Sequence, residues 1–191
     1  DRYLLTFTLR GDGSSKFGKG NQWGLFPSAA LAWRISDETF MESAKDWLSS
    51  LKLRLSFGTA GNNRINSGLL NTTYSLSGND ARYPAFGDAM SSMLEHGTNL
   101  YNPDLKWETT VTRNLGIDYG FWNNRISGSI DLYWNTTKDL LMKTEIPSTT
   151  GYNYQYRNFG QTSNKGVEFS MSAVLLDTKK YGLNFTFNLA Y

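Results

Sequence analysis

Residues 13–20 read GSSKFGKG, which comes close to the glycine-rich loop that holds nucleotide phosphates. That loop needs a Ser or Thr after its lysine to bind magnesium, and a helix must follow. Here Gly20 follows Lys19, and the next stretch has the pattern of a strand and contains Pro27. We therefore exclude a phosphate-binding loop at this place.

The other titratable residues give no catalytic or metal-binding pattern. The chain has no cysteine, and His96, its single histidine, lies in a long connection. Acidic residues such as Asp12, Asp80 and Asp104 are scattered and lack the spacing of a calcium-binding loop. No nucleophile is patterned with a base and an orienting group. We therefore predict that the chain is not an enzyme and that it has no catalytic, cofactor or metal residue.

Composition excludes further classes of protein. The 19 Lys and Arg residues nearly balance 17 Asp and Glu residues, so the formal charge is +2 and no basic face for nucleic acid is expected. No apolar run approaches the roughly 18 residues of a membrane helix, and residues 1–3 show no signal peptide. An aromatic content of 15% with only 4 prolines favours an all-β chain.

The elements that must position these side chains are strands. Residues 125–134 read RISGSIDLYW, in which Ile126, Ile130 and Trp134 alternate with polar residues such as Ser129 and Asp131. Such period-two alternation is typical of a strand with two unlike faces. It recurs in six further stretches, which are residues 3–10, 25–35, 51–58, 110–119, 167–175 and 183–191. We predict seven strands.

The connections between these strands alternate in length. Those over 11–22, 60–106 and 138–163 are long, whereas 122–124 predicts a tight hairpin turn and 177–180 another short link. Residues 37–48 carry apolar side chains at helical spacing, so we expect one short amphipathic helix there, capped by Ser36 or Asp37. Long loops at one end and short turns at the other are typical of outer-membrane barrels.

The apolar faces could contact lipid or a second protein layer. Predicted strands of about 9–13 residues match a tilted membrane crossing and exceed the usual length. Aromatic residues gather at strand ends, where the interface of a bilayer would lie. A soluble glycan-binding or adhesive β-sandwich remains the alternative. Seven strands are fewer than a closed bacterial barrel needs, so a membrane sheet would belong to something larger.

Several motifs occur in a fixed order along the chain. They are DGSSKFG, FPS followed by AWRIS, LKLRLSFGTAGN, NPDLKWE and NKGVEF. With these motifs the chain resembles the C-terminal barrel half of SusC/RagA-like TonB-linked outer-membrane transporters, over almost its whole length. The resemblance implies a partial transmembrane antiparallel up-and-down β-barrel, in which long loops are extracellular and short turns and the helix near 37–48 are periplasmic. Residues 1–191 would be part of the barrel domain, with no plug, TonB box or signal peptide and with the barrel incomplete.

The same resemblance implies a function and a set of partners. It implies import of oligosaccharides or peptides across the bacterial outer membrane, energised through TonB by way of an N-terminal part that this sequence lacks. The implied partners are outer-membrane lipid, a SusD-like surface lipoprotein that forms a lid, TonB, and an oligosaccharide or peptide substrate, and nucleic acid is not among them.

Three groups of residues have a predicted role. We interpret the turn motifs at 12–15, 102–104 and 164–166 as architectural, the last two opening strands. Lys52 and Arg54 fall on polar faces, where they would pair with acids such as Asp118, Asp131 or Glu168 or else steer an anionic solute. An aromatic cluster in the last long loop is the candidate for ligand or lid contact, although its rings could instead pack the loops. Its members are Tyr152, Tyr154, Tyr156 and Phe159.

Overall fold

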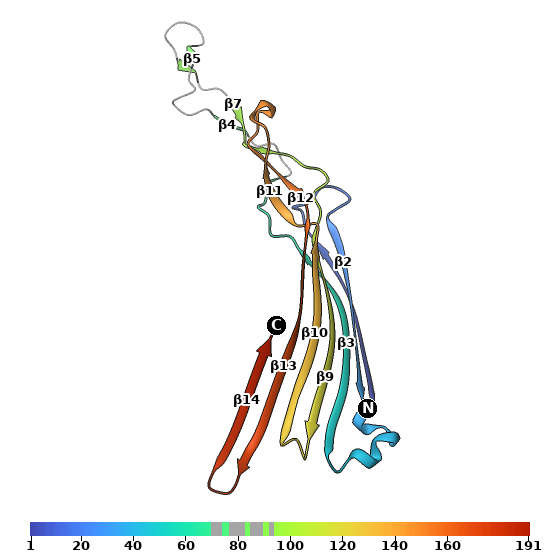
Figure 1. Ribbon diagram of the computed structural model, residues 1–191. Helices are drawn as coiled ribbons and strands as arrows, with labels where there is room; N and C mark the ends of the chain where they lie inside the picture. Colours follow the sequence, from blue (N-terminus) through green and yellow to red (C-terminus); the bar gives the residue numbers. More distant parts are fainter. Residues whose placement is uncertain (70–73, 77–82, 85–89, 92–93) are drawn as a thin grey trace.

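The computed structural model describes residues 1–69, 74–76, 83–84, 90–91 and 94–191. It consists of one long, curved sheet with a group of loops at one end and short turns at the other (Figure 1). Seven antiparallel strands follow one another as neighbours, so the sheet is an up-and-down meander, as predicted. In spatial order they are β1 (Tyr3–Gly13), β2 (Trp23–Arg34), β3 (Leu48–Asn62), β9 (Glu108–Phe121), β10 (Ile126–Lys138), β13 (Gln161–Asp177) and β14 (Gly182–Ala190).

Shorter strands lie within the long connections. A three-stranded sheet pairs β11 (Leu141–Glu145) with β12 (Tyr154–Asn158), and β12 with β8 (Asn99–Leu100). The 3-10 turn η4 (Ser148–Thr150) joins β11 to β12. Two further pairs are formed by β4 (Tyr74–Leu76) with β7 (Leu94–His96) and by β5 (Tyr83–Pro84) with β6 (Met90–Ser91). The side chain of His96 lies outside the described part of the chain.

The connection between β2 and β3 differs from its prediction. Instead of one helix over 37–48 it contains two 3-10 segments, η1 (Ile35–Asp37) and η2 (Thr39–Ala44), and β3 already begins at Leu48. Neither segment has a side-chain cap, and the Ser36 hydroxyl donates to Asp37 instead. Phe40 is 64% exposed, whereas Trp47 stacks on Phe121 of β9 with ring centroids 5.8 Å apart, so the predicted apolar face packs on the sheet at its end and not at Phe40. In the described residues no helix is long and apolar enough to cross a membrane.

The sheet has two unlike faces, set by continuous register. Leu53 pairs with Ile117, Ile117 with Ile130, and Ile130 with Phe169, so one apolar row crosses four strands. The described chain places no second layer on this face, and Leu5, Phe7 and Phe185 are 76%, 68% and 46% exposed. A sandwich needs two packed sheets. The β-sandwich alternative is therefore wrong for the described residues.

The apolar band on this face runs obliquely across the strands. On β2 it ends with Trp33, which shares its row with Phe169 of β13. On β13 the band continues past that row to Leu175. From Phe169 to Leu175 the end of the band moves about 20 Å along β13, while β2 and β13 are four strand spacings, or about 19 Å, apart. The edge of the band therefore crosses the strands at about 45°. Strands of outer-membrane barrels have such a tilt relative to the membrane normal.

One predicted strand start is wrong. Residues 164–166 do not open a strand but lie inside β13, which pairs with β10 from Gln161 onward. Gly166 faces Tyr133 in this pairing, and a Cβ atom at Gly166 would lie 2.5 Å from the Tyr133 hydroxyl oxygen. The glycine therefore makes room for a neighbouring ring within a strand, although glycine beside Asn and Lys suggested a turn.

Candidate functional site

The loops at one end of the sheet pack around a small buried core. Phe17, Ile65 and Leu105 are 0%, 6% and 1% exposed. The side chains of Leu69, Trp107, Leu141 and Tyr156 pack against this cluster. We call the seven residues together the loop hub. The rings of Phe17 and Trp107 have centroids 5.2 Å apart. Three long connections, between β1 and β2, β3 and β9, and β10 and β13, thus share one core.

The turn motif at 102–104 is architectural, as predicted. The Asn102 side-chain oxygen accepts the Asp104 N–H at 3.1 Å, and its amide nitrogen donates to the Tyr156 carbonyl at 2.8 Å. A Cβ atom at Gly18 would lie 2.6 Å from the Pro103 carbonyl oxygen, so only glycine permits this approach. The DGSSKFG and NPDLKWE motifs therefore meet in the hub. The first turn begins at Ser14, later than predicted, because β1 extends through Gly13.

Two polar residues bind these loops together and were missed in the sequence. Asn158 donates to the carbonyl groups of Lys106 and Asp139 at 2.8 and 2.9 Å and accepts the Lys106 N–H at 2.9 Å. Glu108 accepts from the Asn62 amide at 2.9 Å and from the Leu141 N–H at 3.0 Å. The sequence signal for Glu108 was its place at the end of NPDLKWE. Asn158 carries no such signal, since its partners are distant in the chain.

The structure divides the four candidate aromatic residues. Tyr156 packs against the loop hub, and Tyr154 meets it edge-on with ring centroids 6.0 Å apart. The Lys143 ammonium group lies 3.9 Å from the centroid of Tyr154. Tyr152 is half-buried, and its N–H donates to the Thr150 hydroxyl at 3.3 Å. Phe159 is 71% exposed. Ligand or lid contact stays a prediction for all four, and Tyr156 has a packing role in addition.

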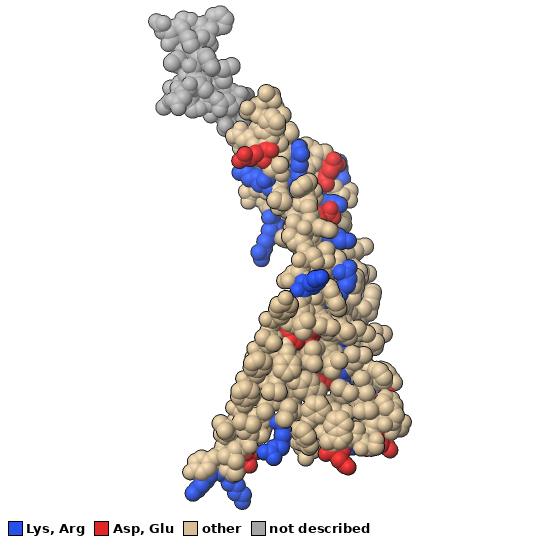
Figure 2. Space-filling model, viewed as in Figure 1, with Lys and Arg blue, Asp and Glu red and all other residues tan. Residues whose placement is uncertain are grey.

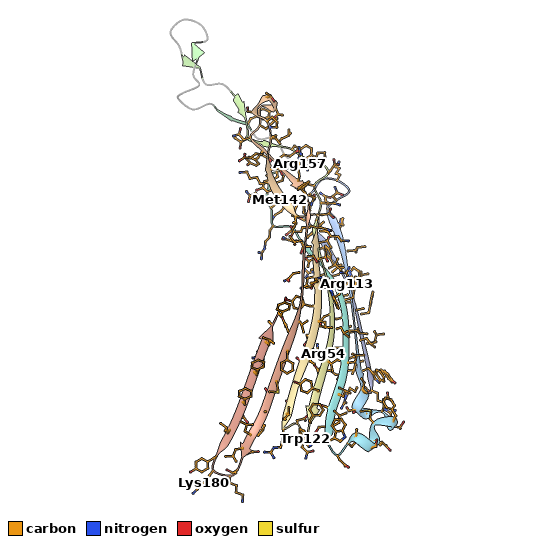
Figure 3. The ribbon with its side chains drawn as sticks, in the orientation of Figure 1. Arg54, Arg113, Trp122, Met142, Arg157 and Lys180 are labelled. Atoms are coloured by element: carbon orange, nitrogen blue, oxygen red, sulfur yellow. The ribbon has the colours of Figure 1, made fainter. Side chains whose placement is uncertain are left out.

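A charge cluster lies on the polar face of the sheet, midway along the strands, where Figure 3 marks Arg54. Arg54 Nη2 lies 2.7 Å from an Asp118 carboxylate oxygen and 3.0 Å from one of Asp131, and Lys52 Nζ lies 2.9 Å from Asp118. These contacts confirm the predicted pairing, except that Glu168 has no ion pair within the described residues. Two cations face two carboxylates, so the cluster presents no net charge for steering an anion.

Arg54 reaches Asp131 across an intervening strand because of one glycine. Arg54 pairs in register with Gly116, and Gly116 pairs with Asp131. A Cβ atom at Gly116 would lie 2.7 Å from the Arg54 guanidinium carbon and 2.5 Å from an Asp131 oxygen. The guanidinium group therefore lies over the bare backbone of β9 and ties β3, β9 and β10 together. Charge-assisted hydrogen bonds of this kind also fix the register of the strands.

A carboxylate anchors aromatic rings at the short-turn end. Glu38 accepts hydrogen bonds from the Tyr3 hydroxyl at 2.6 Å and from the Trp33 indole N–H at 3.0 Å, and Arg2 lies 3.4 Å away. The rings of Tyr3 and Trp33 are stacked with centroids 6.2 Å apart. These hydrogen bonds, first from Tyr3 and then from Trp33, hold the pKa of Glu38 below its ordinary value.

Apart from the cluster around Arg54, most charged side chains visible in Figure 2 lie near the two ends of the sheet. On the face that Figure 2 shows, charged side chains gather over the loops and at the short-turn edge, and the strand-bearing body between them is mostly uncharged. Within the described residues no three side chains of His, Asp or Glu are placed to hold a metal ion. The described chain is therefore a sheet whose polar face carries charges that neutralise one another, with a compact group of loops at one end.

Comparisons with known proteins agree with this geometry. The family model of the TonB dependent receptor-like β-barrel matches residues 1–191. The chain is 42% identical to the TonB-dependent receptor SusC of Bacteroides thetaiotaomicron and 35% identical to the TonB-dependent receptor P39 of Formosa agariphila, in each case over its whole length. It spans 19% and 17% of these two relatives, about a fifth of their length.

Solved structures give the same result. The RagAB peptide importer in its closed-closed state matches with a TM-score of 0.79 at 33% identity, covering 98% of this chain and 20% of that chain. The siderophore receptor PirA of Pseudomonas aeruginosa, at 20% identity and a TM-score of 0.60, shares the fold; the match covers 99% of this chain and 31% of that chain. The chain therefore belongs to the TonB-dependent receptor-like β-barrel family, and its sheet forms part of an outer-membrane barrel.

Proposed function

We propose that this chain is the part of an outer-membrane active transporter that supplies a section of barrel wall and of the extracellular loop platform. The transporter would import oligosaccharides or peptides with energy delivered through TonB, together with a SusD-like lipoprotein lid. Residues 1–191 would then be part of its barrel domain, and the plug and TonB box would lie elsewhere in the longer protein.

One observation carries this proposal. The seven-stranded sheet exposes a broad apolar band on one face, while its other face is polar and carries a neutralised cluster of charges. Such a sheet is stable where one face contacts lipid and the other lines a hydrated interior. The relative named as a peptide importer supports peptides as the solute, and the relative SusC, named as a TonB-dependent receptor, supports the role of TonB.

Transport itself can be tested in cells. We expect cells that produce the full-length protein to take up labelled oligosaccharides or short peptides, and uptake to stop when TonB is deleted or a protonophore collapses the proton gradient. Surface binding of the labelled solute would persist under both treatments. Uptake that continued unchanged without TonB would contradict the proposed energy source.

The loops offer a matched pair of variants for solute contact. Phe159 is exposed at the end of the aromatic cluster, whereas Tyr156 packs into the loop hub. If exposed rings stack on the solute, Phe159→Ala weakens binding of the labelled solute about fivefold to tenfold and leaves the loops folded. Tyr156→Ala instead makes the loops sensitive to protease. Unchanged binding in Phe159→Ala would remove Phe159 from the contact surface.

A further inference from the structure

Basic side chains lie on the apolar face of the sheet, at the row where that face changes character. Phe57 pairs with Arg113, Arg113 with Trp134, and Trp134 with Lys165, so these four side chains form one row across β3, β9, β10 and β13. Toward the short turns, the next outward row is apolar and consists of Leu55, Leu115, Leu132 and Val167. Toward the loops, the next outward row contains Thr59, Val111, Thr136 and Ser163. On these four strands the row of Arg113 thus lies at the loop-side edge of the apolar band, which continues further on β1 and β2 to Leu9 and Leu25.

Among the described residues, the two cations of this row have no charged partner. Arg113 and Lys165 are both exposed, and the ion pairs among the described residues all involve other side chains. They lie on either side of Trp134, two strand spacings apart, which is about 10 Å. By contrast, the basic residues of the polar face nearby, Lys52 and Arg54, are neutralised by carboxylates.

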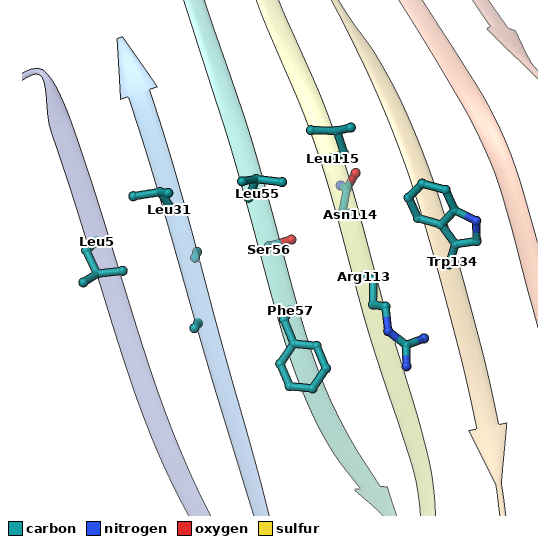
Figure 4. A pocket seen from close by; sticks show the side chains of 11 residues that line it. Leu5, Leu31, Leu55, Ser56, Phe57, Arg113, Asn114, Leu115 and Trp134 are labelled. Carbon is teal, nitrogen blue, oxygen red and sulfur yellow. The ribbon is translucent and has the colours of Figure 1, made fainter.

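Each cation stands at the side of an apolar groove, and Trp134 forms the ridge between the two grooves. The first groove, with a volume of about 510 Å³, is lined by Arg113, Trp134 and aliphatic side chains of β1, β2, β3 and β9 (Figure 4). These aliphatic side chains include Leu5, Leu31, Leu55 and Leu115. The second groove, of about 260 Å³, is lined by Lys165, Trp134, Leu132, Val167 and Tyr191.

We propose that this row binds a lipid whose headgroup carries a net negative phosphate, in the leaflet on the loop side of the outer membrane. The acyl chains would lie along the two grooves, and the phosphate would contact Arg113 and Lys165 on either side of the Trp134 indole. The outward face contacts lipid, so an acyl chain is the occupant that the grooves meet there. The charge complementarity of two unpartnered cations selects an acidic headgroup among lipids.

The residue types fit this occupant. A guanidinium group presents paired N–H donors that match phosphate oxygens, and an indole ring lies at the level where hydrocarbon meets headgroups. A basic residue on a lipid-facing surface is unfavourable near the midplane but close to neutral at the interface. An acidic headgroup adds attraction there, worth about fivefold in affinity for each basic residue.

The test uses the full-length protein after detergent extraction and delipidation. Phosphatidylglycerol, and separately phosphatidylcholine, is titrated in and bound lipid is counted by native mass spectrometry. We expect phosphatidylglycerol to bind more tightly than phosphatidylcholine to the unaltered protein. The double variant R113Q/K165Q should weaken phosphatidylglycerol binding about thirtyfold and leave phosphatidylcholine binding unchanged.

Three controls make this result specific. The charge-conserving variant R113K/K165R should retain most of the preference. K179Q/K180Q, which removes two cations at the short-turn end, should behave as the unaltered protein. Inorganic phosphate alone should not displace the lipid, because it lacks acyl chains. Folding of each variant is checked by heat-modifiable migration in gels. Equal phosphatidylglycerol binding by R113Q/K165Q and the unaltered protein would overturn the proposal, as would an equal loss in K179Q/K180Q.

Discussion

The loop hub and the long sheet treat apolar side chains in opposite ways. In the hub, Phe17 and Leu105 are almost fully buried by protein, as in a soluble domain. In the sheet, Ile130 and Phe185 are 39% and 46% exposed although each sits in an unbroken apolar row. The same driving force acts in both places, since apolar surface leaves water. In the hub, protein atoms replace the water, and in the sheet we propose that lipid does.

This difference determines which residues are sensitive to substitution. A cavity left in the hub has no protein or lipid to fill it, whereas lipid chains adapt to a smaller side chain on the sheet. A charge is tolerated on the polar face of a strand and is unfavourable on the opposite face within the middle of the apolar band. The following predictions test this contrast in the full-length protein reconstituted in lipid vesicles.

The largest effect is expected in the hub. Phe17→Ala should destabilise the folded loops by about 3–5 kcal/mol, because the ring is 0% exposed and packs against Trp107. Hydrogen exchange of the backbone amides in 14–22 and 102–107 measures the free energy of this opening. Phe159→Ala, at a ring that is 71% exposed, should change the same quantity by less than about 0.5 kcal/mol. Equal effects of the two variants would mean that the hub is not a core.

The next effect compares two adjacent residues of β14 that lie on opposite faces. Phe187 pairs with Met171 on the apolar face, and Asn188 pairs with Ser170 on the polar face. Phe187→Arg should lower the free energy of unfolding by about 2–4 kcal/mol, as expected for a cation facing hydrocarbon near the middle of the bilayer. Asn188→Arg should lower it by less than about 1 kcal/mol. Urea-induced unfolding followed by tryptophan fluorescence distinguishes these outcomes, and the reverse order would invert our assignment of the two faces.

A third effect concerns the charge cluster on the polar face. Arg54→Met should cost about 1–3 kcal/mol, because it leaves Asp118 and Asp131 close together without the guanidinium group that they share. Adding Asp131→Asn to this variant should recover part of the loss, since one carboxylate then remains beside Lys52. The same urea titrations give both values as a double-mutant cycle. A second substitution that only adds to the loss would show that repulsion between the carboxylates is not the cause.

The sheet and its charge pairs could be predicted from the sequence because they depend on a short-range rule. In a strand, alternate residues share a face, so Lys52 and Arg54 had to lie on the polar side together with Asp118 and Asp131. The up-and-down order of the strands then placed β3, β9 and β10 side by side. The order of the motifs indicated the family, and membership of an outer-membrane barrel family implies that the apolar face contacts lipid.

The loop hub could not be predicted in the same way. Phe17, Ile65, Leu105 and Tyr156 come from three connections, and Phe17, Ile65 and Leu105 are scattered apolar residues in polar stretches. No periodicity joins them, and their contacts depend on tertiary structure alone. The two wrong predictions have a related cause. The helical spacing over 37–48 is a local signal, and the early start of β3 at Leu48 prevented a helix of that length. The glycine at 166 is also a local signal, but it serves the packing of Tyr133 within a strand and does not form a turn.

The smallest effect is expected at the short-turn end, where Glu38 joins the sheet to the connection after β2. The folded protein holds the pKa of Glu38 below its ordinary value of 4.5, mainly through the Tyr3 and Trp33 hydrogen bonds. A carboxylate with a lowered pKa contributes stability that is complete above its unfolded pKa and is lost as the pH falls through its folded pKa. Acidification from about pH 5 should therefore release this contribution.

Glu38→Gln should remove that acid-dependent step, because an amide can still accept from Tyr3 and Trp33 but does not titrate. The change in melting temperature between about pH 5 and pH 3 measures it. Glu42→Gln, which removes a neighbouring carboxylate that pairs with Lys45, should keep the full step. The effect is small because Glu38 binds the ends of two rings at the edge of the sheet, while the rest of each ring lies in the apolar band. An acid-dependent step that survives in Glu38→Gln would assign it to another carboxylate and leave the two rings anchored by stacking alone.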